Sequence, residues 1–155
     1  MRAFISYSHK DEGFLEPFKT CLTPIAAANG IEIWSDTDIP TGAFWKQHIM
    51  DRIATADLFF PLVSPHFMAS DFIMKEEIPR MIARGGAGGA LLLPVILRRC
   101  AWQMVFQWIQ VTPVTKGKLR PVGNWTPQSD GFDRAREEIT NAITSRTPVP
   151  SGSTS

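Results

Sequence analysis

The chain has 155 residues, enough for one domain of ordinary size that buries its own hydrophobic core. Sixteen basic and fifteen acidic residues give a net charge of +1, which argues against strong attraction to nucleic acid or to an anionic membrane surface. The longest apolar runs are too short to span a bilayer, and no signal-peptide pattern opens the chain. Cys21 and Cys100 form no paired motif, so we expect reduced thiols in a soluble cytoplasmic protein.

The opening residues predict a strand, a helix and a second strand. Residues 3–7 are apolar and rich in β-formers, and they end at a polar run. Apolar side chains from Leu15 to Ile25 then recur at spacings of three and four, which is typical of one helical face. Asn29 and Gly30 are a stop signal for that helix, and residues 31–34 predict the second strand.

The middle of the chain repeats this alternation. Residues 35–42 predict a loop rich in Asp, Pro and Gly, and a helix follows with Thr41 as its cap. The unbroken apolar run 58–63 predicts a third strand, and residues 67–84 a third helix. The glycines of 85–89 form a connector, because a phosphate-binding loop follows a strand, opens a helix and carries Lys-Ser/Thr.

The last third predicts two more strands and a final helix. Residues 90–97 and 109–114 are the expected strands, although 101–127 is otherwise poorly patterned. Apolar positions from Phe132 to Ile143 mark the helix. Pro61 and Pro94 lie inside expected strands, where proline removes a ladder donor. From residue 146 the composition turns to Pro, Ser, Gly and Thr, so we expect a domain over 1–145 and a flexible tail or linker over 146–155.

Alternating strands and helices predict an α/β sandwich with a mostly parallel sheet. The third and fourth strands are continuous apolar runs, as expected for strands that are covered on both faces. In an open parallel sheet, ligands bind beyond the carboxyl ends of the strands. Those ends, at residues 7–9, 34–36 and 63–65, are short and rich in hydrogen-bonding groups, so we expect the site there.

Three stretches carry a family resemblance. Phe-Ile-Ser-Tyr-Ser-His-Lys-Asp at residues 4–11 is similar to the opening strand and loop of Toll/interleukin-1 receptor (TIR) domains. Trp34-Ser35-Asp36, followed by Ile39, Gly42 and Trp45, resembles their second block. Residues 64–76 resemble the helix that ends in the catalytic glutamate of that family. The resemblance covers about residues 2–97 and implies a flavodoxin-like three-layer α/β sandwich with a central, mostly parallel five-stranded sheet.

The resemblance also implies a function. Bacterial TIR domains often cleave the nicotinamide–ribose bond of NAD, so the expected activity is that of an NAD glycohydrolase or cyclase activated by self-association. NAD is then a substrate, and no cofactor is expected. The implied partners are other TIR domains in a homo-oligomer or filament and a fused or associated sensor domain, in a bacterial defence or signalling protein. The alternative is a non-catalytic scaffold that acts by homotypic TIR assembly. The three histidines have no metal-ligand spacing, so no metal is expected.

Two adjacent glutamates compete for the catalytic position, and the resemblance assigns it to Glu76. Neighbouring residues of an α-helix point about a hundred degrees apart. Phe72 and Glu76 are four apart and so share a face, and Phe72 keeps an aromatic ring where many TIR domains have tryptophan. A solvated helix surface is the alternative reading for both Glu76 and Glu77.

The remaining candidate substrate-binding residues lie at the strand ends and on the two nearby helices. Ser8 and His9 suit contacts to ribose or phosphate and equally suit capping of the next helix. Asp36 suits a polar network below the site and equally an Asx turn. Between Phe44 and Trp45, Phe44 is the better ligand candidate, because Trp45 opens an apolar helical face. The full candidate set is Tyr7, Ser8, His9, Asp36, Phe44, Trp45 and Phe72.

Overall fold

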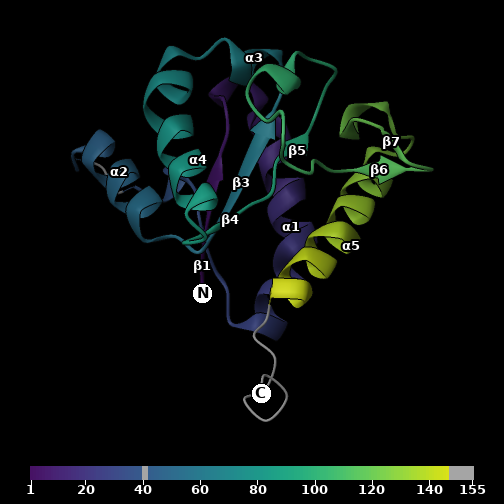
Figure 1. Cartoon of the computed structure of the whole chain (residues 1–155), viewed down its shortest axis with the longest axis horizontal. Helices are drawn as coiled ribbons and strands as arrows, with labels where there is room; N and C mark the ends of the chain where they lie inside the picture. Colours follow the sequence, from purple (N-terminus) through teal and green to yellow (C-terminus); the bar gives the residue numbers. More distant parts are fainter. Residues whose placement is uncertain (40–41, 147–155) are drawn as a thin grey trace.

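The computed structural model describes residues 1–39 and 42–146, and Figure 1 shows three layers with the sheet between two groups of helices. The strands are β1 (Arg2–Ser6), β2 (Glu32–Trp34), β3 (Leu58–Val63), β4 (Leu91–Leu92), β5 (Val95–Ile96), β6 (Val114–Thr115) and β7 (Lys118–Leu119). The longer helices are α1 (Glu12–Asn29), α2 (Trp45–Thr55), α4 (Ile78–Gly86) and α5 (Gln128–Arg146). Shorter helical turns are η1 (His9–Asp11), η2 (Asp36–Asp38), α3 (Pro65–Met68), the π-helix η3 (Ile73–Glu77), η4 (Trp102–Met104) and η5 (Val122–Asn124).

The central sheet has five strands, all parallel. Its order is β2-β1-β3-β4, and β5 pairs with the carboxyl end of β3. The expected α/β fold with a mostly parallel five-stranded sheet is confirmed. Every residue of β3 is buried, as expected for a strand covered on both faces.

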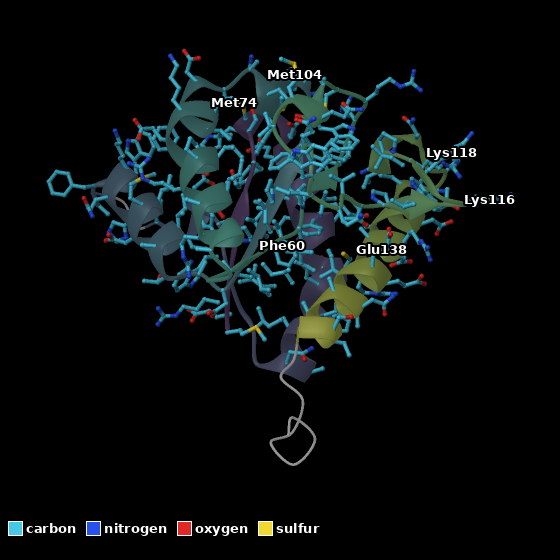
Figure 2. The ribbon with its side chains drawn as sticks, in the orientation of Figure 1. Phe60, Met74, Met104, Lys116, Lys118 and Glu138 are labelled. Carbon is cyan, nitrogen blue, oxygen red and sulfur yellow. The ribbon has the colours of Figure 1, made fainter. Side chains whose placement is uncertain are left out.

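Alternation along β3 divides the core between the two helical layers. Phe60 packs in the cluster that includes α1 and α5, whereas Phe59 packs in the cluster that includes α2 and α4. Successive strand residues point to opposite faces, so one apolar run supplies both cores. Phe60 lies near the centre of the molecule in Figure 2, and its ring meets Phe18 of α1 edge to face at 5.5 Å.

The stop signal predicted for the first helix is confirmed. Asn29 is the last residue of α1, and Gly30 adopts the left-handed conformation with φ of 62°. The Gly30 amide bonds to the Ala26 carbonyl, which closes the helix in the way that glycine favours. After this turn the chain continues directly into β2, the neighbour of β1.

Two strand predictions need correction. The expected strand 90–97 is divided into β4 and β5, with Pro94 between them, because proline cannot donate to a ladder. The expected fifth strand at 109–114 is wrong. There the chain makes an isolated bridge between Thr112 and Val95, and Val114 begins the separate antiparallel pair β6–β7. The fifth strand of the central sheet is therefore β5.

Other boundary predictions fall partly outside the described residues. Thr41, the expected cap of the second helix, lies outside them, and α2 begins at Trp45 with Phe44 in the cap position. The tail expected over 146–155 starts at the last residue of α5, and residues 147–155 lie outside the described part. Within the described residues, no helix has the length and apolarity needed to cross a membrane.

Candidate active site

A hollow of about 520 Å³ opens beyond the carboxyl ends of β1 and β2. This is the edge of an open parallel sheet at which ligands bind. Its walls come from the segment after β1, the segment after β2, the start of α2 and the turn before α4. The lining residues are Tyr7, Ser8, His9, Asp36, Ile39, Ala43, Trp45, Ile49, Ser70, Phe72, Ile73 and Glu77.

The loop after β1 supplies three polar side chains to this hollow. Ser8 caps η1, because its hydroxyl accepts a hydrogen bond from the Lys10 amide at 3.3 Å. Ser8 therefore fulfils the capping expectation and lines the hollow as well. The His9 ring lies 5.7 Å from the Tyr7 ring, and His9 Nε2 contacts the carboxylate of Asp36. One short loop thus links the ends of β1 and β2.

The segment after β2 is held rigid by reciprocal capping. The Ser35 amide donates to Asp38 at 2.9 Å, and Arg52 of α2 donates to the Ser35 carbonyl at 2.9 Å. Asp36 is carried between these anchors, and its Oδ1 is buried without a hydrogen-bond partner among the described residues. Burial and then the charge of Asp36 raise the pKa of Tyr7, so its hydroxyl stays protonated.

Glu77 lies at the base of the hollow and is only 5% exposed. Its Oε1 accepts a 2.8 Å hydrogen bond from the hydroxyl of Ser6, the last residue of β1. Burial raises the pKa of Glu77 to about 7, an effect that the Ser6 hydrogen bond opposes. The charge of Asp36 raises that pKa further, and His9 lowers it. Near neutral pH the Glu77 carboxyl group is therefore present in both its protonated and its ionised form, and it lines the hollow.

A π-helical turn determines which glutamate faces the hollow. The amide of Ile78 bonds to the carbonyl of Ile73, five residues earlier. Phe72 and Glu77, also five apart, both line the hollow. Pro79 offers a physical cause for this turn, because proline has no amide for the Lys75 carbonyl and its ring would crowd that carbonyl in a regular α-helix.

Glu76 lies outside the hollow. Its carboxylate pairs with Lys46 at 3.5 Å and with Arg80 at 3.0 Å, and its side chain is 32% exposed. Arg80 also donates to the Glu76 carbonyl at 2.7 Å. The structure does not place Glu76 in the hollow as the sequence led us to expect, because that expectation treated the turn as α-helical, with residues four apart on one face. Glu76 instead belongs to a surface ion-pair cluster.

Two aromatic rings form an apolar wall of the hollow. Trp45 and Phe72 meet edge to face, with ring centroids 4.9 Å apart. Phe44, by contrast, is 85% exposed and does not line the hollow. The preference for Phe44 over Trp45 as a contact in this hollow is therefore reversed, since the chain enters α2 with Phe44 directed to solvent.

Comparison with known proteins identifies the family. A family model described as TIR domain matches residues 3–143. The chain belongs to the TIR-domain family. It is also 33% identical over 140 residues to uncharacterized protein y4lF of Sinorhizobium fredii (strain NBRC 101917 / NGR234), which covers 90% of this chain and 42% of that protein. The chain thus spans about two fifths of the length of that relative.

A solved structure is also similar to this TIR domain. It is the TIR domain of the Toll-related receptor TRR-2 from Hydra magnipapillata, at 20% identity and a TM-score of 0.49. The match covers 69% of this chain and 81% of that one.

The hollow of this TIR domain brings together most of the candidate residues. Six of them line it: Tyr7, Ser8, His9, Asp36, Trp45 and Phe72. Sequence reasoning did not single out Ser6 or Ser70 for this site, and it weighed Glu77 but chose Glu76. Pro79 was the available signal for Glu77, because a proline shortly after the two glutamates indicates a disturbed helical turn at that point.

Proposed function

We propose that this TIR domain cleaves the nicotinamide–ribose bond of NAD, with the Glu77 carboxylate acting at the ribose. The observation that carries the proposal is the position of Glu77, buried at the base of the hollow and held there by Ser6. The assignment replaces Glu76, whose carboxylate is engaged by Lys46 and Arg80 outside the hollow.

A single carboxylate is chemically sufficient for this bond. Nicotinamide attached to ribose carries a positive charge and departs as a neutral molecule, so no acid is needed to protonate the leaving group. Ordinary glycoside hydrolysis, in contrast, uses a pair of carboxyl groups for this reason. Positive charge gathers on the ribose in the transition state, and the ionised form of Glu77 would stabilise it within a partly dry cavity. Water or another nucleophile then completes the reaction.

The size and lining of the hollow support a nucleotide substrate. Its volume of about 520 Å³ is within the range of small-molecule sites, roughly 300–1,000 Å³. We assign the apolar wall of Trp45 and Phe72 to an aromatic ring of NAD, and the polar rim of Ser8 and His9 to its ribose and phosphate groups. Asp36 positions His9 through their direct contact.

Comparing two adjacent substitutions tests the proposal. Glu77→Gln and Glu76→Gln change neighbouring residues of one turn by the same chemistry, and nicotinamide release from NAD is measured by chromatography. We expect Glu77→Gln to lose at least about 100-fold in turnover, as is typical when a transition-state charge loses its partner. Glu76→Gln should retain activity within a few-fold. Loss on Glu76→Gln with retention on Glu77→Gln would reverse the assignment, and retention by both would refute it.

A second candidate function, a non-catalytic TIR scaffold, is favoured by exposed apolar side chains. Phe44 is exposed beside the hollow, and Trp108 is 90% exposed beside a separate apolar groove. Contiguous exposed apolar surface, such as the groove beside Trp108, marks interaction sites. Protein that forms oligomers yet releases no nicotinamide at any concentration would support the scaffold. Activity that rises faster than linearly with concentration would support an enzyme activated by self-association.

The cellular setting belongs to the same proposal. We propose an effector module of a bacterial defence or signalling protein, acting in the cytoplasm and joined to a sensor domain in the same or an associated chain. Two free cysteines suit a reducing compartment. The relative y4lF is longer than this chain, which leaves room for a further domain in such a protein.

A further inference from the structure

The charges of this chain are unevenly distributed. Between Ile78 and Ser129 there is no Asp or Glu, whereas that segment holds seven Lys and Arg residues. All fifteen acidic residues and nine basic ones lie in the rest of the chain. The net charge of +1 therefore averages a basic segment against an acidic remainder. The low net charge of the whole chain predicts little attraction to anions, but that argument does not hold for the basic segment taken by itself.

Six of the seven basic residues in this segment have no carboxylate partner among the described residues. Arg80 pairs with Glu76, and Arg84 donates to backbone carbonyls of Ile53 and Gly89. In the part of the chain that the structure describes, the other five form no ion pair. They are Arg98, Arg99, Lys116, Lys118 and Arg120. Figure 2 shows Lys116 and Lys118 projecting outward from the β6–β7 hairpin.

Two of the five line a cavity of about 340 Å³ that follows the carboxyl end of β5. Arg99 and Arg120 contribute guanidinium groups, Gln103 and Asn124 carry amides, and Trp102 offers a half-buried aromatic ring. The other lining residues are Cys100, Leu119 and Pro121. No carboxylate lines this cavity, and no residue is shared between it and the hollow of Glu77.

Arg120 is held in place before any ligand arrives. Its guanidinium lies 4.5 Å from the centre of the Trp125 ring and donates one hydrogen bond, of 3.1 Å, to the Asn124 carbonyl. The Trp125 indole donates in return to the Arg120 carbonyl at 2.9 Å. A guanidinium has five N–H donors, so most of its donors stay available to an anion. Because Arg120 is already held in place, less side-chain conformational entropy is lost when a ligand binds.

The two sides of the cavity are fixed to the sheet and to a tight hairpin. The amide of Gly123 donates to the carbonyl of Leu97, directly before the Arg98–Arg99 pair, at 2.8 Å. On the other side, Lys116 and Gly117 both have positive φ angles, of 52° and 76°, as in the tight turns favoured by β-hairpins. That hairpin ends at Leu119 and so sets the position of Arg120.

We propose that this cavity is a second ligand site, which binds a nucleoside phosphate. Guanidinium groups bind phosphate oxygens in a bidentate manner, and Arg99 and Arg120 supply two such groups. An aromatic ring stacks on a base of any type, and the amides of Gln103 and Asn124 bond to base edges. The volume admits a single nucleotide, at the small end of known ligand sites. The proposal does not depend on NAD cleavage at Glu77.

A protection experiment locates the site in the unmodified protein. Cys100 lines the cavity, and Cys21 lies in α1 near the Phe132 carbonyl, 3.7 Å from its sulfur. Both thiols are allowed to react with a maleimide at pH 8.5, and the rate of labelling at each is followed by mass spectrometry. We expect ADP to slow labelling of Cys100 at least fivefold while labelling of Cys21 is unchanged. Adenosine and inorganic phosphate, each tested alone, should need at least tenfold higher concentration for the same protection.

Charge removal then tests which side chains bind. Arg99→Gln removes an exposed side chain that forms no ion pair among the described residues, and we expect it to weaken ADP binding, measured by calorimetry, about tenfold, the loss typical of a charged hydrogen bond. Lys118→Gln removes the same charge from the hairpin outside the cavity and should change the Kd less than threefold. Glu77→Gln should leave this binding intact.

Three results would overturn the proposal. The first is equal loss for Arg99→Gln and Lys118→Gln, which would mean a diffuse electrostatic field. The second is equal protection of Cys100 by phosphate and by ADP, which would mean a plain anion site. The third is an affinity for single-stranded oligonucleotides that rises more than tenfold with length, which would mean a nucleic-acid groove. None of these results bears on nicotinamide release by Glu77, so the two proposals fail separately.

Discussion

Replacing Glu77 with glutamine should stabilise the folded domain at alkaline pH. Burial raises the pKa of Glu77 from 4.5 to about 7. One pKa step is worth about 1.36 kcal/mol, so ionising this group in the folded protein costs about 3 kcal/mol. Below pH 4.5 the folded and unfolded chains both hold the proton and the cost is absent. The cost grows from pH 4.5 to 7, because over that range the unfolded chain loses its proton first.

Urea unfolding and thermal unfolding, both followed by tryptophan fluorescence, measure this effect. At pH 8, Glu77→Gln should raise the free energy of unfolding by about 3 kcal/mol and the Tm by roughly 6–12 °C. At pH 5 the gain should shrink to about 1 kcal/mol. Glu76→Gln is the matched control and should stay within about 0.5 kcal/mol of the parent at both pH values. A gain that is no larger at pH 8 than at pH 5, or a loss at pH 8, would refute the reasoning.

Three further measurements probe the same site and its scaffold. If ionised Glu77 acts on NAD, kcat/KM should rise with pH through about 7 and then level off; a profile that falls over this range contradicts the assignment. Ser6→Ala removes a donor that favours the ionised carboxylate, so the midpoint should move to higher pH, and an unmoved midpoint would leave Ser6 without this role. Gly131→Ala should cost about 1–3 kcal/mol in urea unfolding, because a Cβ there would lie 2.7 Å from Trp125, whereas Gly13→Ala, which meets open space, should cost nothing.

Periodicity was enough to predict the layers of the fold. The apolar run of β3 and the three-four spacing from Leu15 to Ile25 are strong signals, because burial on a sheet or on one helical face leaves little choice of residue. The failures occurred where a single backbone group decides the outcome. Pro94 interrupts a strand that hydrophobicity alone joins, and one bridge at Thr112 replaces the expected fifth strand.

The position of the site was predictable, and the identity of its carboxylate was not. Polar residues at the ends of β1 and β2 marked the hollow, since parallel strands end at one edge of the sheet. Choosing between Glu76 and Glu77 required the local helical geometry, because a shift of one residue along the turn exchanges the buried carboxylate for the exposed one. Hydrophobic pattern is insensitive to one π-helical turn, whereas the turn changes which carboxylate is buried.

The burial that makes Glu77 costly to the fold also suits it to a cationic substrate. In the empty hollow a substantial fraction of the carboxyl is protonated at neutral pH, because burial disfavours its charge. A permanently positive nicotinamide–ribose group beside it favours the ionised form and so recovers part of that cost. The reduced dinucleotide has no such charge and recovers none of it. Ionisation of Glu77 would thus be coupled to the presence of the bond on which we propose it acts. The Ser6 hydrogen bond favours the same ionised form and so increases the ionised fraction of Glu77 in the empty hollow.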